Sequence, residues 1–291
     1  MHIRRLLFSC FLVASGLWAA EVEKGVAARN IQTRSFQSAA LGEKRYFNIL
    51  LPTDYEKSFR RYPTLYLLHG YGDDHTAWSY MTNLSHYAER HHIIVVMPDG
   101  SKSFYVNSAA DPKAKYEDFI VKDLVAEVDS SFRTIPLPRA RALAGLSVGG
   151  YGAAFLGLKH YKEFAAFGAF SGALGIAHQM PPTPANAAAN KRTSQMQAVF
   201  GPPASPARAA RDPFALLEKV PPAEMPMIYV ACGGQDFLLS QNRAFVELLA
   251  EKKVPYEYRE ISPRIHEWDF WDDQIRIFLD LIARLPGFRQ R

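Results

Sequence analysis

The sequence predicts one α/β domain, in which a mostly parallel, eight-stranded sheet is covered by helices on both faces. Short apolar runs recur along the chain, and amphipathic helical patterns lie between many of them. This alternation is typical of a doubly wound sheet, whose central strands are buried on both sides. In addition, residues 141–159 have the pattern of a strand, a glycine-rich turn and a helix. A chain of 291 residues with 48% hydrophobic content can bury a core of this size.

The strands are expected in the following order. Residues 29–36 and 44–51 have the pattern of an antiparallel pair joined around Gly42. Six further runs follow at 64–68, 93–97, 142–146, 164–170, 227–232 and 256–261. Several of these runs are almost continuously apolar, which indicates parallel strands that are covered on both faces.

Four helical patterns lie between and after these strands, at 119–132, 148–159, 240–252 and 268–285. The segment around 176–212 interrupts the alternation with six prolines and an Ala/Asn-rich centre. It falls between the sixth and seventh strands, where this architecture commonly accepts insertions near the active site. We expect a lid or a pocket wall there; the alternative is a passive surface excursion.

The first 20 residues have the pattern of a secretory signal peptide. Two arginines precede a short apolar run, and Ala19 and Ala20 precede the first acidic residue. The apolar run is shorter than the roughly 20 residues that a membrane-spanning helix needs. We therefore expect a secreted or periplasmic protein without stable membrane insertion, in which residues 21–291 form a single domain.

Charge and cysteine content exclude several classes of protein. The net charge of +5 is small and evenly spread, which argues against a nucleic-acid partner. Removal of the signal peptide would leave Cys232 as the only cysteine, so we expect no intrachain disulfide. Cys232 ends an apolar strand and is interpreted as a buried, inert thiol. Two cysteines in all are too few for a thiolate zinc site.

Three residues have the types and the order of a catalytic triad. Ser147 is the centre of a Gly-x-Ser-x-Gly turn between a strand and a helix, which exposes a serine hydroxyl as a nucleophile. The base and the acid of such a triad follow later strands in the order acid, then histidine. Asp236 follows the seventh strand and His266 follows the eighth. The alternative is a turn serine in a non-catalytic α/β protein.

Acyl transfer also needs two donors for the developing oxyanion. The backbone amide of Val148, directly after Ser147, is expected to be one. The other is expected from the loop after the third strand, most simply the amide of Tyr71. His69 in the same loop is interpreted as a residue that shapes the loop rather than as a catalytic residue.

Five motifs occur in order along the chain: Leu67–Gly72 with Trp78 beyond, Ser103–Tyr105, Gly145–Gly152, Gly233–Asp236 and His266–Trp271. Together they resemble the esterase family of the α/β-hydrolases, which includes esterase D (S-formylglutathione hydrolase), feruloyl esterases, tributyrin esterases and the antigen 85 mycolyltransferases. The resemblance covers about residues 46–285 and implies an α/β-hydrolase fold. It supports the triad and the two amide donors named above. It also implies that Phe104, Tyr105 and Trp268 border the substrate cleft, with ordinary packing as the alternative.

The leading functional prediction is a secreted serine esterase that works through an acyl-enzyme and needs no metal or organic cofactor. Its substrate would be a small-molecule or carbohydrate-linked ester. An acyltransferase that uses a sugar or lipid hydroxyl as acceptor would have the same triad. A binding protein on a hydrolase scaffold is the third alternative. The acyl group, the alcohol and the oligomeric state are not indicated by the sequence.

Overall fold

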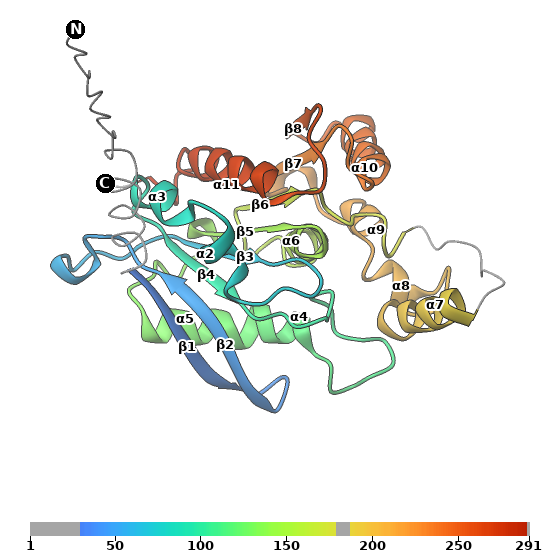
Figure 1. The fold of residues 1–291 in the computed structure, drawn as a ribbon, viewed down its shortest axis with the longest axis horizontal. Coiled ribbons are helices and arrows are strands. Elements are labelled where there is room, and N and C mark those ends of the chain that lie inside the picture. Colours follow the sequence, from blue (N-terminus) through green and yellow to red (C-terminus); the bar gives the residue numbers. More distant parts are fainter. Residues whose placement is uncertain (1–29, 179–186, 290–291) are drawn as a thin grey trace, which may run out of the picture.

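The computed structural model describes residues 30–178 and 187–289. Its centre is an eight-stranded sheet with the strand order β1-β2-β4-β3-β5-β6-β7-β8 (Figure 1). β1 and β2 are antiparallel to each other, β2 is antiparallel to β4, and the strands from β4 to β8 are parallel. The predicted fold class, a mostly parallel sheet of the α/β-hydrolase kind, is therefore confirmed. The predicted signal peptide lies outside the described residues.

The observed strands differ from the predicted ranges by at most two residues at either end. They are β1 (Ile31–Ser38), β2 (Glu43–Leu50), β3 (Thr64–Leu68), β4 (Ile94–Pro98), β5 (Arg141–Leu146), β6 (Ala166–Phe170), β7 (Met227–Gly233) and β8 (Tyr256–Ile261). Every residue of β3, β4, β5 and β6 is buried. Continuous burial on both faces is the reason that these strands could be recognised as apolar runs.

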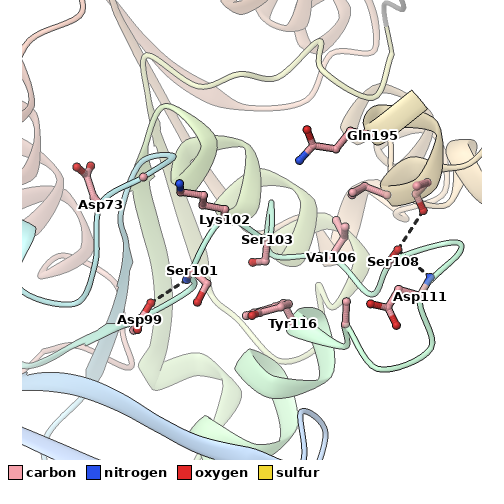
Figure 2. Close-up of a pocket in the computed structure, with 14 residues that line it drawn as sticks. Asp73, Asp99, Ser101, Lys102, Ser103, Val106, Ser108, Asp111, Tyr116 and Gln195 are labelled. Atoms are coloured by element: carbon pink, nitrogen blue, oxygen red, sulfur yellow. Dashed lines mark hydrogen bonds between the residues drawn. The ribbon is translucent and has the colours of Figure 1, made fainter. Parts of the chain in front are cut away.

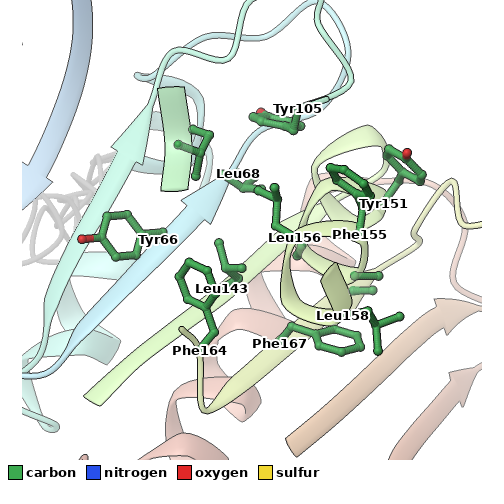
Figure 3. Packing of buried hydrophobic residues seen from close by; sticks show 14 of the residues in the cluster. Tyr66, Leu68, Tyr105, Leu143, Tyr151, Phe155, Leu156, Leu158, Phe164 and Phe167 are labelled. Carbon is green, nitrogen blue, oxygen red and sulfur yellow. The ribbon is translucent and has the colours of Figure 1, made fainter. Parts of the chain in front are cut away.

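Helices pack on both faces of the sheet, and each face has its own apolar core. One face is covered by α2 (Ala77–Met81), α3 (Leu84–Glu89) and α11 (Trp268–Ile282). The other is covered by α5 (Val125–Ser131), α6 (Val148–Lys159), α9 (Pro213–Leu217) and α10 (Leu239–Glu251). Figure 3 shows Phe155 and Leu156 of α6 within this second core, near Leu143 of β5 and Phe167 of β6. No helix in the described part of the chain is both long enough and apolar enough to cross a bilayer.

The helix predicted over 119–132 begins three residues earlier and contains a wider turn. It consists of α4 (Tyr116–Asp118), the π-helical turn η3 (Phe119–Leu124) and α5. Short 3-10 helices are η2 (Tyr55–Lys57), η4 (Pro138–Ala140) and η5 (Pro222–Glu224). Glu117 of α4 is buried and ties this helix to the end of α6, with Lys159 Nζ and His160 Nε2 each 2.8 Å from its carboxylate.

The proline-rich segment forms helices at the edge of the domain: α7 (Ala187–Phe200), α8 (Pro206–Ala209) and α9. Pro206 and Pro213 stand at the first turn of α8 and α9, where a missing amide hydrogen costs nothing. The end of α7 is joined to the loop after β4, since the carbonyls of Ala198 and Val199 accept hydrogen bonds from that loop, each of 2.9 Å.

The start of α6 lies very close to the carboxyl end of β3. A Cβ at Gly149 would be 2.4 Å from Leu68 O and 2.6 Å from His69 O, distances that real Cβ atoms do not show. We expect Gly149→Ala to lower the free energy of unfolding by about 3 kcal/mol, as overpacking against a backbone does. Urea unfolding measures the loss.

Gly42→Ala is a suitable control for this prediction. Gly42 has a φ of 68° but has nothing within 4 Å of its added Cβ. Because only backbone strain opposes that substitution, it should lower the free energy of unfolding by about 1 kcal/mol. Equal losses for the two variants would show that the close approach at Gly149 is unimportant.

The Glu117 contacts predict a pH dependence of stability. Burial alone would raise the pKa of Glu117, but the hydrogen bonds and charges of His160 and Lys159 hold that pKa below its ordinary value. A carboxyl group with a lowered pKa stabilises the fold above its unfolded pKa, and this stabilisation disappears as the pH falls through its folded pKa. Between about pH 7 and pH 3, the wild type should therefore lose more unfolding free energy than Glu117→Gln. Parallel pH curves in urea unfolding would contradict this expectation.

Candidate active site

Ser147 occupies a strained turn between β5 and α6, with φ 53° and ψ −118°. Its amide donates to Phe170 O at 2.9 Å, and its carbonyl accepts from Ala173 N at 2.9 Å. A Cβ at Gly145 would be 2.5 Å from the backbone of Gly149, so the turn closes only with glycine there. The hydrogen bonds on both sides hold Ser147 in a backbone conformation that an L-residue seldom adopts.

The structure brings the three predicted triad residues together at the carboxyl edge of the sheet. His266 Nε2 lies 3.1 Å from Ser147 Oγ, and His266 Nδ1 lies 2.9 Å from Asp236 Oδ2. Asp236 comes from the loop after β7, and His266 from the loop after β8, as the order of strands requires. The arrangement joins a hydroxyl, an imidazole and a carboxylate in one hydrogen-bonded chain.

Asp236 is buried, with 5% of its surface exposed. Burial alone would raise its pKa, but hydrogen bonds from His266, the Ser171 hydroxyl and the Leu238 amide hold the pKa below its ordinary value. The Leu238 amide donates to Oδ1 at 2.8 Å, which leaves Oδ2 for His266. The carboxylate is thus kept ionised and oriented towards the imidazole.

Aromatic side chains surround His266. The buried Trp271 lies edge-on, with its ring centroid 4.8 Å from that of the imidazole, and its Nε1 donates to Ser171 Oγ at 3.2 Å. Trp268, at the start of α11, packs at nearly right angles against Trp78 and Trp271. On the side of the acid, Phe237 has its ring centroid 4.6 Å from the imidazole.

The loop after β3 lies beside Ser147. A Cβ on Gly70 would be 3.7 Å from the Cβ of Ser147, and Tyr71 and Gly72 follow directly. Val148, the other expected donor, is the first residue of α6, where helix geometry leaves an amide hydrogen without an intrahelical acceptor. The loop and the helix start are thus adjacent to the hydroxyl, in agreement with what an oxyanion site needs.

His69 holds this loop in shape. It is 1% exposed, its Nε2 accepts a hydrogen bond from the Gly100 amide at 2.9 Å, and its Nδ1 lies 2.7 Å from Gly70 O. Burial lowers the pKa of His69, although the hydrogen bond to Gly70 O acts in the opposite direction. With Nε2 as an acceptor, Nδ1 carries the proton and donates to Gly70. Both ring nitrogens are therefore used within the protein.

The aromatic residues expected at the cleft have different surroundings. Tyr105 is 1% exposed, and its hydroxyl donates to His69 O at 2.9 Å, so its contacts are those of the packing alternative. Phe104 is 3% exposed and lies between Tyr71, at 5.4 Å, and Phe200 of α7, at 5.3 Å between ring centroids. The prediction that Phe104 and Tyr105 border the cleft is thus corrected, because a buried ring offers almost no surface to a substrate. The ring of Phe104 contacts that of Tyr71, a residue that is 47% exposed.

A cavity of about 700 Å³ opens next to the loop after β3 (Figure 2). Its walls are the residues after Tyr71, the loop after β4, and α7, from which Gln195, Ala198 and Val199 contribute. The polar residues of the lining are Asp73, Asp99, Ser101, Lys102, Ser103, Ser108, Asp111, Tyr116 and Gln195. Figure 2 shows Gln195 across the cavity from the loop that carries Lys102. Part of the segment predicted as a lid or pocket wall therefore lines a cavity.

Three residues beside the predicted triad were assigned no role from the sequence: Phe237, Ser171 and Trp271, although Trp271 ends the motif His266–Trp271. Ser171 follows β6 and Trp271 lies within α11, and no local pattern links either to Asp236. Phe237 could have been noticed, because it directly follows the expected acid. In the described part of the chain, no three His, Cys, Asp or Glu side chains converge as metal ligands.

Residues 38–279 match the model of the family described as "Putative esterase". An acetyl esterase of Caldicellulosiruptor saccharolyticus is 33% identical over 254 residues, covering 83% of this chain and 93% of that protein. Esterase Rv1288 of Mycobacterium tuberculosis is 30% identical over 271 residues. That match covers 86% of this chain but 58% of the larger esterase.

Solved structures agree with this assignment. The substrate-bound fluorophosphonate-binding serine hydrolase F of Staphylococcus aureus has a TM-score of 0.75 and 25% identity, covering 87% of this chain and 98% of its own. An S-formylglutathione hydrolase of Agrobacterium tumefaciens also has a TM-score of 0.75, but at 19% identity it supports the fold alone. The match over residues 38–279 and the acetyl esterase together establish that this chain belongs to the esterase family of the α/β-hydrolases.

Proposed function

We propose that this esterase is a secreted serine hydrolase that cleaves carboxylic esters through an acyl-enzyme on Ser147. The observation that carries the proposal is the hydrogen-bonded chain from Asp236 through His266 to Ser147 Oγ. Secretion is proposed from the signal-peptide pattern of the first 20 residues.

In the proposed mechanism, His266 takes the proton of Ser147 while Oγ attacks the ester carbonyl. Asp236 keeps the proton-bearing Nδ1 of His266 in place and stabilises the imidazolium that forms. The amides of Val148 and Tyr71 receive the developing negative charge on the carbonyl oxygen. His266 then protonates the leaving alcohol, and in the second half of the reaction it activates water to release the acid. Every proton in this scheme is moved by the protein's own groups.

The cavity beside the oxyanion loop supports a substrate with a hydroxyl-rich portion. Serine hydroxyls and the Gln195 amide can both donate and accept hydrogen bonds, as sugar hydroxyls require. The carboxylates of Asp73 and Asp111 disfavour an anionic group in the same space, and among the described lining residues Lys102 alone is cationic. A neutral ester whose portion in this cavity carries hydroxyl groups therefore fits this lining better than a charged peptide thioester.

Replacement of the nucleophile tests the proposal. Ser147→Ala should reduce turnover of p-nitrophenyl acetate by about ten-thousandfold or more, as the loss of a triad serine does. It should also abolish covalent labelling by a fluorophosphonate probe. Ser130→Ala, on the exposed end of α5, serves as the control and should keep both properties. Normal turnover by Ser147→Ala would overturn the proposal, and an unlabelled wild type would favour a binding protein on a hydrolase scaffold.

Acyl transfer is the second candidate, because the mycolyltransferase Ag85A of Mycobacterium tuberculosis is 28% identical over 258 residues. The two activities share the triad and differ only in the acceptor that attacks the acyl-enzyme. We expect p-nitrophenyl acetate in the presence of glycerol or trehalose to yield mainly free acetate. A product analysis in which the acetylated acceptor predominates would identify a transferase instead.

A further inference from the structure

Phe237 is an exposed aromatic residue that stands directly beside the imidazole of the triad. Its side chain is 74% exposed, although most phenylalanines of this protein are buried. The centroid of its ring is 4.6 Å from that of His266, with the two planes tilted by 49°. Trp271, the other aromatic neighbour of His266, is buried and therefore has no comparable free surface. The exposed face of Phe237 therefore provides an apolar surface next to His266.

The loop that carries Phe237 is held on both sides. The residues before and after it are joined by the hydrogen bond from the Leu238 amide to Asp236 Oδ1, at 2.8 Å. The Gln235 amide donates to Arg264 O at 2.9 Å, which connects this loop to the one that carries His266. The backbone that carries the ring of Phe237 is therefore held by the hydrogen bond to the Asp236 carboxylate. A contact that is positioned before the ligand arrives costs little ordering entropy.

The proposed reaction determines which part of the substrate contacts the exposed ring of Phe237. His266 must protonate the leaving oxygen, so the alcohol has to lie within hydrogen-bond reach of Nε2. The group attached to that oxygen then extends along the imidazole side of the site, where Phe237 is exposed. The acyl group, in contrast, remains on Ser147 after the alcohol has left.

We propose that Phe237 forms the subsite for the alcohol portion of the ester and that this subsite takes ring-bearing alcohols with a flat apolar face. The inference rests on the proposed esterase function and deepens it. A ring in the leaving group can stack on or pack edge-on against Phe237, a contact that an open-chain alcohol makes over a smaller area. Phe237 is a specificity-determining residue in this scheme and takes no part in proton transfer.

Two acetyl esters with similar alcohols separate this role from a general effect on catalysis. Benzyl acetate and ethyl acetate form the same acetyl-enzyme and release simple primary alcohols, but only one alcohol has a ring. We expect the wild type to prefer benzyl acetate, and Phe237→Ala to lower the ratio of the two kcat/KM values about tenfold. Phe237→Tyr keeps the ring and should restore the ratio. The hydrolysis of both esters is followed by titration of the released acid.

The step that follows loss of the alcohol provides an internal comparison. Hydrolysis of the acetyl-enzyme no longer involves the leaving group, so Phe237→Ala should slow it much less than it slows acylation by benzyl acetate. Phe59→Ala serves as the matched control, because Phe59 is a fully exposed phenylalanine in the loop before the amino end of β3, whereas Phe237 follows the carboxyl end of β7. This control should leave the ratio unchanged.

Three results would overturn the inference. An unchanged ratio in Phe237→Ala would show that the alcohol does not contact the ring. Equal losses for both esters and for hydrolysis of the acetyl-enzyme would show that Phe237 only holds His266 in position. A wild type that hydrolyses neither ester and resists the fluorophosphonate probe would remove the proposed function as well. In the first two cases the Ser147 chemistry remains intact, so the failures are distinguishable.

Discussion

The close approach of three backbone segments at the carboxyl edge of the sheet is the constraint on which the site depends. The end of β3, the end of β5 and the start of α6 meet there, at distances that exclude a Cβ on Gly145 and Gly149. This approach holds Ser147 at a positive φ and places the loop after β3 beside its hydroxyl. A single packing requirement therefore exposes the hydroxyl and positions the loop that is proposed to bind the oxyanion.

The remainder of the site is built on loops that are fixed by buried polar groups. Asp236 is held by the Leu238 amide, and Trp271 donates a hydrogen bond to Ser171, whose hydroxyl also contributes to the lowered pKa of that carboxyl. On the other side of Ser147, the buried ring of His69 connects Gly70 to Gly100. Because these donors and acceptors are used inside the protein, few alternative loop conformations satisfy them in the absence of water.

The surroundings of Ser147 differ in chemistry from one side to the other. Towards the loop after β4 the wall is polar and rich in hydroxyl and carboxylate groups, and α7 closes it with Gln195. Towards the loop after β7, the exposed aromatic ring of Phe237 lies against His266. An ester has two unlike portions on either side of its carbonyl, and an asymmetric site can distinguish them.

The sequence by itself determined the strand order along the chain, the turn at Ser147 and the positions of Asp236 and His266. These features could be predicted because buried parallel strands have continuous apolar runs in the sequence, and because triad residues follow strand ends in a set order. Only the tertiary structure decided which side chains face the site. Tyr105 was expected at the cleft but is buried, with its hydroxyl bonded to His69 O. The contacts of Phe237 and Trp271 with His266 depend on side-chain directions that the motifs around these residues do not specify. The π-helical turn before α5 was likewise not predictable, whereas part of the segment expected as a lid or pocket wall does line a cavity. Local periodicity indicates whether a residue is buried. It does not indicate which distant residue packs against it, because long-range packing decides that contact.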